Sequence, residues 1–157
     1  MDFSRLFLET TGFIEFVPLL EIYTAACPSS GGVYVVTYNT NGQISFRDKS
    51  CGGRFKGKDP TVSLDELAAE WVDGADVVYI GKGDNLKRRL RQFANFGSGK
   101  PVGHWGGRLI WQLENINALH VAWKETQGQE PRIVEQELMS TFKSTYGRLP
   151  FANLRMS

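Results

Sequence analysis

Residues 76–91, DVVYIGKGDNLKRRLR, contain the change of pattern that decides the fold. Residues 76–80 are rich in β-branched and aromatic side chains, which predicts a strand. The apolar residues then recur three and four positions apart, which predicts an amphipathic helix that Asp84 or Asn85 can cap. The apolar positions of this helix are Leu86, Leu90 and Phe93. We therefore expect a strand that leads directly into a helix with a basic, solvated face.

A similar strand pattern lies upstream, where residues 33–38 read VYVVTY. The preceding residues 27–32, CPSSGG, predict a turn-rich connector. Residues 39–42, NTNG, predict a turn into a further strand at 43–47. Two strands thus carry a tyrosine near a glycine, in the motifs Gly32-Val33-Tyr34 and Tyr79-Ile80-Gly81.

The rest of the chain alternates between helical and strand patterns. The further expected elements are one or two helices in residues 1–26, a loop at 48–60, a helix at 63–74, strands at 109–113 and 118–124, and a helix at 131–146. Pro18 should interrupt the first helical region, because proline disrupts a helix interior. Ser63 and Glu66 form a capping box, and Pro131 suits the first position of the last helix.

Composition fits one globular domain, since the chain has 157 residues and 41% of them are hydrophobic. The net charge is only +1, but the charge is unevenly distributed. Residues 82–108 contain seven basic residues and one acidic residue, so this segment carries +6 and the remainder −5. Such segregation attracts a polyanion to one face of the molecule.

The N-terminal region does not have the pattern of a signal peptide, because Glu9, Glu15 and Glu21 interrupt its apolar stretches. No apolar run is long enough to cross a bilayer, and two cysteines are too few for a disulfide scaffold. We therefore expect a cytoplasmic protein with no membrane partner. The sequence carries no indication of the oligomeric state.

The two tyrosine motifs, the basic helix, Glu135 and Asn153 resemble, in this order, the GIY-YIG nucleases. Tyr79-Ile-Gly-Lys82 followed by NLKRRL at 85–90 is the most specific part of the match. The resemblance implies an α+β fold, in which a small, mainly antiparallel sheet is flanked by helices. It implies one nuclease domain, with a helical extension before the first motif and an insertion between the motifs. The bounds are 1–157 for the domain, about 1–30 for the extension, and about 39–75 for the inserted strand, loop and helix.

The resemblance also implies hydrolysis of phosphodiester bonds in DNA with the help of one divalent metal ion. Glu135 corresponds to the metal ligand, and Mg²⁺ or Mn²⁺ suits a carboxylate oxygen. Arg89 corresponds to the catalytic arginine, whose planar guanidinium donates two hydrogen bonds to phosphate oxygens. Asn153 would orient Glu135, the substrate or a bound water.

The tyrosines would act on the attacking water. Tyr34 is the base that the resemblance implies, although a phenol with a pKa of ~10 is only ~0.1% ionised at neutral pH. Lys82 and the metal would have to favour the phenolate. Tyr79 would hydrogen-bond the phosphate or the attacking water. The family often has histidine or tyrosine at the position of Phe93, and His104 is the candidate that replaces this polar group.

Five further basic residues are candidates for contacts with nucleic-acid phosphates: Lys87, Arg88, Arg91, Lys100 and Arg108. The partner we expect is DNA, either double- or single-stranded, and RNA is the less favoured substrate.

Other interpretations remain open. A tyrosine in a strand is more often a packing residue, and basic residues on a helix often form only its solvated face. His104 and Arg108 could be structural. The alternative function is a nucleic-acid-binding module that has kept the fold and lost the chemistry. Residues 52–58 approach a P-loop, but Asp59 stands where a serine or threonine is required, so we reject a nucleoside triphosphatase.

Overall fold

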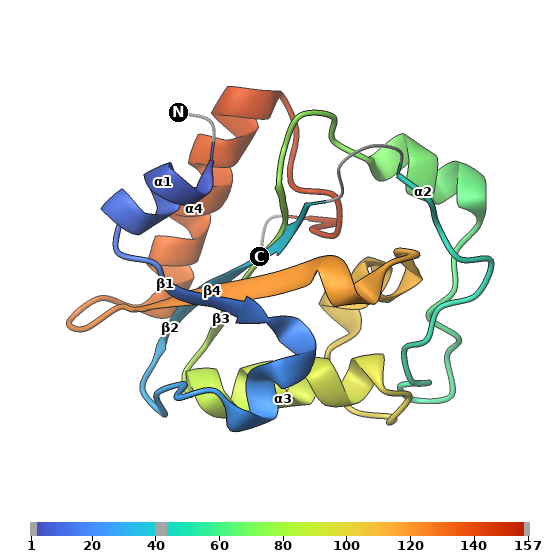
Figure 1. Ribbon diagram of the computed structural model, residues 1–157, viewed down its shortest axis with the longest axis horizontal. Coiled ribbons are helices and arrows are strands. Elements are labelled where there is room, and N and C mark those ends of the chain that lie inside the picture. The colour runs from blue at the N-terminus through green and yellow to red at the C-terminus, as the bar shows by residue number, and fades with distance from the viewer. Residues whose placement is uncertain (1–2, 40–43, 156–157) are drawn as a thin grey trace.

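The computed structural model describes residues 3–39 and 44–155, and within them four strands form one antiparallel sheet. The strands are β1 (Ile14–Pro18), β2 (Gly32–Tyr38), β3 (Val77–Gly83) and β4 (Leu119–Glu125). Their order across the sheet is β1-β4-β2-β3, so β2 is central and β3 is an edge strand (Figure 1). The expected α+β class with an antiparallel sheet is confirmed.

Helices cover both faces of the sheet. The helices α1 (Arg5–Thr10) and α4 (Pro131–Tyr146) lie on one face, and α3 (Leu86–Gly97) lies on the other (Figure 1). Side chains alternate along β2, so Val33 and Val35 join the core under α4, while Tyr34 and Val36 join the core under α3. This alternation directs the first motif tyrosine towards α3.

The helix α3 forms as its sequence predicts. The side chain of Asn85 accepts a hydrogen bond from the main-chain nitrogen of Arg88 at 3.0 Å, which caps the first turn. The three apolar positions Leu86, Leu90 and Phe93 are fully buried against the sheet. Their burial fixes the rotation of the helix and therefore the direction of its basic side chains.

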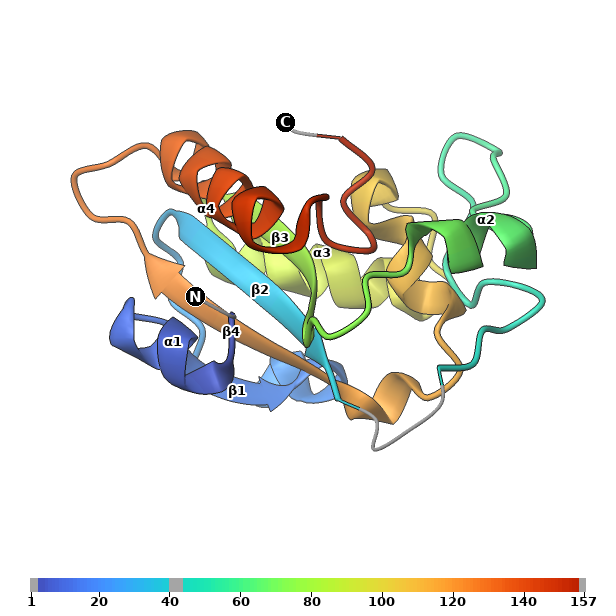
Figure 2. The ribbon, with the colours of Figure 1, turned by 90° about the horizontal axis from the view of Figure 1, so that it is seen from above.

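The helix α2 (Leu64–Glu70) begins at the expected cap, since the hydroxyl of Ser63 accepts from the main-chain nitrogen of Glu66 at 3.2 Å. It ends earlier than residues 73–74, because Trp71 has an extended backbone with φ −63° and ψ 138°. The indole ring of Trp71 packs against Phe46 and Phe151, with ring centroids 6.1 and 5.1 Å apart. Packing therefore ends this helix one turn early. In both views α2 lies at the end of the molecule away from α1 (Figures 1 and 2).

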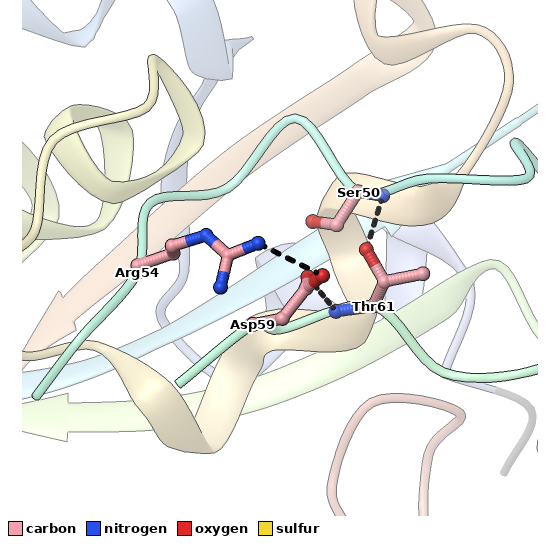
Figure 3. A network of polar contacts seen from close by, with 4 residues as sticks. All are labelled: Ser50, Arg54, Asp59 and Thr61. Atoms are coloured by element: carbon pink, nitrogen blue, oxygen red, sulfur yellow. Dashed lines mark hydrogen bonds and ion pairs between the residues drawn. The ribbon is translucent and has the colours of Figure 1, made fainter. Parts of the chain in front are cut away.

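The loop between β2 and α2 is held by a polar network (Figure 3). Asp59 accepts from the main-chain nitrogen of Thr61 at 2.9 Å and pairs with Arg54 at 3.4 Å. The hydrogen bond from Thr61 lowers the pKa of Asp59, which therefore stays ionised. The hydroxyl of Thr61 accepts in turn from the main-chain nitrogen of Ser50 at 3.0 Å. A fixed carboxylate here repels phosphate, which agrees with the rejection of a P-loop.

Of the one or two helices expected in residues 1–26, the structure contains one α-helix, α1, but the apolar residues from Phe13 to Tyr23 that supported the prediction do not form an α-helix. The chain forms β1 there and then a 3-10 helix, η1 (Leu19–Thr24). Strand β1 contains a bulge, because its register with β4 shifts between Ile14 and Val17, and Glu15 and Phe16 have φ of 85° and 45°. The bulge breaks the two-residue alternation of a strand. Apolar residues therefore recur at a spacing that imitates a helix.

The expected strand at 109–113 is also wrong, because these residues fall largely in a 3-10 helix, η2 (Trp105–Gln112). Leu109, Ile110 and Trp111 are all buried, so the run lacks the alternation that distinguishes a half-buried strand from a buried helix. The expected strand at 43–47 is reduced, in its described part, to one bridge between Phe46 and Leu113. The turn expected at 39–42 lies largely outside the described residues.

The later elements agree with expectation. A short 3-10 helix, η3 (Ile116–Ala118), precedes β4, which begins one residue later than predicted. Pro131 is the first residue of α4, and Gly147 ends the helix in the left-handed conformation with φ 80°. Within residues 3–39 and 44–155, no helix combines the length and the apolar character that crossing a bilayer requires.

Candidate functional site

A pocket of about 540 Å³ lies over the edge strand β3, and residues of α3, η2, α4 and the C-terminal segment also line it. Its lining residues are Tyr34, Tyr79, Lys82, Arg89, Trp105, Gly106, Arg108, Glu135, Met139, Asn153, Leu154 and Arg155. Six of the seven candidate catalytic residues line the pocket directly. The seventh, His104, does not line it but contacts the hydroxyl of Tyr34. The sheet and the two long helices therefore bring together residues 119 positions apart in the chain, from Tyr34 to Asn153.

The two motifs meet because of the strand register. Tyr34 on β2 lies directly opposite Gly81 on β3. A Cβ atom added at Gly81 would collide with the phenol ring of Tyr34. The glycine of the second motif thus leaves room for the tyrosine of the first, which is fully buried and lines the pocket from β2.

Tyr34 belongs to a tightly packed aromatic group. Its hydroxyl lies 2.7 Å from Nε2 of His104, and its ring centroid lies 6.1 Å from that of Tyr79. The imidazole of His104 stacks on Phe93 at 4.1 Å between centroids, with an interplanar angle of 22°. Phe93 therefore supports the imidazole with an apolar face, and His104, from the segment before η2, supplies the polar ring.

Burial controls the protonation of this group. It raises the pKa of Tyr34 well above the usual value and that of Tyr79 to about 12, while the positive charge of Arg89 opposes both shifts. Burial, followed by the charge of Arg89, lowers the pKa of His104 well below its usual range. Both phenols and the imidazole are therefore neutral at physiological pH. The environment does not favour the phenolate that Lys82 was expected to promote.

Arg89 is fixed before any ligand binds. One guanidinium nitrogen, Nη1, donates to Oε1 of Gln92 at 2.7 Å and to the carbonyl of Gly103 at 2.8 Å. The aliphatic stem of Arg89 lies against β3, since a Cβ atom added at Gly83 would lie 2.8 Å from the Cβ of Arg89. These contacts hold Nη1, a further side-chain hydrogen bond links Arg89 to Tyr34, and the remaining guanidinium donors can serve an anion in the pocket.

Glu135 is an acidic residue that is only 4% exposed, and it lines the pocket from α4. Among the described residues that line the pocket it supplies the single carboxylate. The described part of the chain contains no group of three or more histidine, cysteine or acidic residues that could enclose a metal ion. One carboxylate fits Mg²⁺, which keeps several waters and shares substrate phosphate oxygens, better than it fits a metal held only by protein ligands.

Asn153 lines the pocket, but its carboxamide is used by the main chain. Its Oδ1 accepts from the nitrogen of Ile80 at 2.8 Å, and its Nδ2 donates to the carbonyl of Ile80 at 2.9 Å. The nitrogen of Ala152 also donates to the carbonyl of Val78 at 2.9 Å. The C-terminal segment thus returns alongside β3 (Figure 2) and satisfies an edge that would otherwise be unpaired. By pairing with the main chain of Ile80, Asn153 fixes the position of β3 between Tyr79 and Gly81.

The basic candidates separate into three groups. Lys82 and Arg108 line the candidate pocket. Lys87, Arg88 and Arg91 line a second hollow of about 450 Å³ on the outer side of α3, where Arg91 donates to the carbonyl of Tyr23 at 3.1 Å. Lys100 lines neither hollow and is exposed.

Sequence patterns missed several pocket residues. Trp105, Met139, Leu154 and Arg155 line the candidate pocket, and Arg132 lines an adjoining hollow of about 550 Å³ that shares Lys82 and Arg89 with it. The available signal for Trp105 was its place beside His104 in the glycine-rich segment GHWGGR at 103–108. Arg132 and Met139 share a face of α4 with Glu135, three residues before it and four after it, so the helical spacing was an available signal for both. Leu154 and Arg155 follow no spacing rule, because the C-terminal turn brings them in.

Comparisons of this chain with models of known protein families, with curated proteins and with solved structures gave no match.

Proposed function

We propose that this chain is a metal-dependent endonuclease of the GIY-YIG type, which hydrolyses phosphodiester bonds in DNA. The observation that carries the proposal is that Tyr34, Tyr79, Arg89 and Glu135 come from four separate elements and line one pocket. Lys82, Arg108 and Arg155 add three further basic side chains. Four basic side chains, one buried carboxyl group and two phenols match the needs of phosphodiester hydrolysis, which are charge neutralisation and activation of a water.

Arg89 binds and orients the scissile phosphate, and its contacts with Gln92 and Gly103 remove the cost of ordering it during the reaction. Glu135 would hold Mg²⁺ through a carboxylate oxygen. When bound there, the ion supplies positive charge to the phosphate and to the leaving oxygen. Tyr79, whose pKa is about 12, donates a hydrogen bond as a neutral phenol.

Tyr34 and His104 form a proton relay. The relay requires the tautomer of His104 with its proton on Nδ1, in which the hydroxyl of Tyr34 donates to Nε2, 2.7 Å away, and the phenol oxygen accepts a proton from the attacking water. As the water proton moves to Tyr34, the phenol proton moves to the imidazole. In the free protein, burial and then the charge of Arg89 disfavour the imidazolium and lower the pKa of His104. A phosphate bound to Arg89 offsets that charge, so His104 becomes a better proton acceptor when substrate is present.

A nicking assay tests the proposal. Purified protein is incubated with single- and double-stranded DNA and with RNA, in Mg²⁺ or in EDTA, and Arg89→Lys is compared with the matched variant Arg88→Lys on the outer side of the same helix. We expect DNA cleavage that EDTA abolishes, that R89K strongly lowers and that R88K retains. Binding without EDTA-sensitive cleavage would contradict the proposal and favour the inactive binding module. A pocket with one carboxyl group among its described lining residues is also compatible with that module.

A further inference from the structure

A stacked pair of side chains forms one wall of the candidate pocket. The guanidinium carbon of Arg108 lies 4.8 Å from the ring centroid of Trp105. Nη1 of Arg108 also donates to the carbonyl of Trp105 at 3.1 Å, so the cation is held over the ring. Both residues are half-buried, and both line the pocket. The pair is therefore a flat, positively charged surface that a ligand in the pocket can reach.

This stacked pair lies beside the residues that we propose to hold the phosphate. Gly106 lies between the two residues in sequence, and a Cβ atom added to it would lie 3.8 Å from the hydroxyl of Tyr79. The same segment supplies the carbonyl of Gly103 to Arg89 at 2.8 Å. A group on the sugar next to a phosphate at Arg89 is therefore within reach of the pair.

The pocket is also larger and more apolar than a phosphate requires. Its volume of about 540 Å³ lies in the range of sites that enclose a small organic molecule. Besides the polar residues, its lining includes the apolar side chains Met139 and Leu154, and Leu154 is 41% exposed. Such a mixed lining suits a nucleotide, in which a charged phosphate is attached to a flat base.

We propose that Trp105 and Arg108 form a stacking platform for one unpaired nucleobase next to the scissile phosphate. The inference rests on the proposed function and narrows its substrate class to DNA that is single-stranded or extruded at the cut. In a continuous duplex both faces of each base are covered by its neighbours, so no face is free to stack on the platform. Aromatic rings and guanidinium planes are the groups on which proteins stack such unpaired bases.

A binding cycle tests the platform without depending on cleavage. Fluorescence anisotropy in EDTA measures the affinity for a fluorescein-labelled hexathymidylate, for the same backbone with all bases removed, and for a blunt duplex. The variants are Trp105→Leu and Trp105→Phe, and Trp71→Phe, a ring that packs on Phe151 in the core, is the matched control. We expect W105L to weaken hexathymidylate binding about tenfold, and W105F and W71F to stay within about twofold of the wild type.

The base-free backbone gives the decisive comparison. We expect W105L and the wild type to bind it equally, because the lost interaction is with a base. An equal loss on hexathymidylate, base-free backbone and duplex would overturn the platform and assign Trp105 a structural role. Since binding is measured without hydrolysis, the cycle can succeed for a protein that does not cut. Conversely, if the protein cleaves continuous duplex DNA and W105L leaves hexathymidylate binding unchanged, the proposed function is retained and this inference is rejected.

Discussion

The hydroxyl of Tyr34 lies 2.7 Å from Nε2 of His104, although the two residues are 70 positions apart in the chain. Tyr34 comes from the central strand β2, and His104 comes from the segment before η2. The imidazole is 1% exposed, and Nδ1 has no hydrogen-bond partner among the described residues. A buried imidazole that uses one nitrogen on a tyrosine is costly, and the proposed proton relay gives it a function.

Removal of the relay should lower hydrolysis more than binding. We expect Tyr34→Phe to reduce the rate of DNA cleavage by about 100-fold or more, because it removes the group that accepts the proton of the water. His104→Gln should have an effect of similar size. The double variant should be little worse than either single variant, since the two groups act as one unit. Single-turnover kinetics measures all three rates, and fully additive losses would reject a relay.

The glycine of the second motif should tolerate no side chain. In Gly81→Ala the new methyl group meets the phenol of Tyr34, so we expect a loss of about 1–3 kcal/mol in the free energy of unfolding. Gly106→Ala is the matched control, because its methyl group would have only the hydroxyl of Tyr79 nearby, at 3.8 Å. Chemical denaturation measures both variants. Equal stability of G81A and G106A would show that the register does not constrain Tyr34.

Asn153 should behave as a positioning residue. Asn153→Ala leaves the nitrogen and the carbonyl of Ile80 without their partners, so we expect a loss of about 1–3 kcal/mol of stability. Hydrogen exchange should also become faster at Ile80. The neighbouring variant Leu154→Ala removes a side chain that is 41% exposed and serves as the control. Normal stability and protection in N153A, together with lost cleavage, would instead indicate a direct catalytic role.

The buried imidazole predicts a pH dependence of stability. Because the pKa of His104 is lowered in the folded protein, the unfolded chain binds the proton first as the pH falls below about 6.5. The contribution of His104 is therefore present above this pH and is lost progressively below it, by about 1.4 kcal/mol per pH unit. His104→Gln should remove this part of the dependence. Denaturation at pH 7.5 and 5.5 measures it, with His120→Gln as the control for loss of an imidazole. An unchanged difference in H104Q would contradict the burial of a neutral ring.

Parts of this fold follow from local signals. The helix α3 was predictable because a capping residue and a regular apolar stripe agree, and α4 because Pro131 and Gly147 mark its ends. Strand β1 was not predictable, since its bulge gives helical spacing. The helix η2 was not, since an unbroken apolar run fits either a strand or a helix. Both errors lie where tertiary packing, rather than local pattern, decides the backbone.

The candidate site divides in the same way. Tyr34, Tyr79, Arg89 and Glu135 could be selected from ordered motifs, and the structure brings them to one pocket. Trp105 could not, because its role depends on a guanidinium three residues away and on a pocket built from distant elements. The main-chain contacts of Asn153 could not be predicted from the sequence either, since only the sheet order identifies β3 as an edge strand.

The most direct test of a nuclease centre in this pocket is the Mg²⁺-dependent nicking of supercoiled plasmid by Glu135→Gln, measured beside Glu137→Gln. Glu135 is buried at the pocket, whereas Glu137 lies two residues further along the same helix and is exposed. The two variants make the same chemical change on one element, so a general effect on α4 would alter both. We predict that E135Q loses Mg²⁺-dependent nicking and that E137Q cuts at the wild-type rate. Wild-type nicking by E135Q would contradict the account.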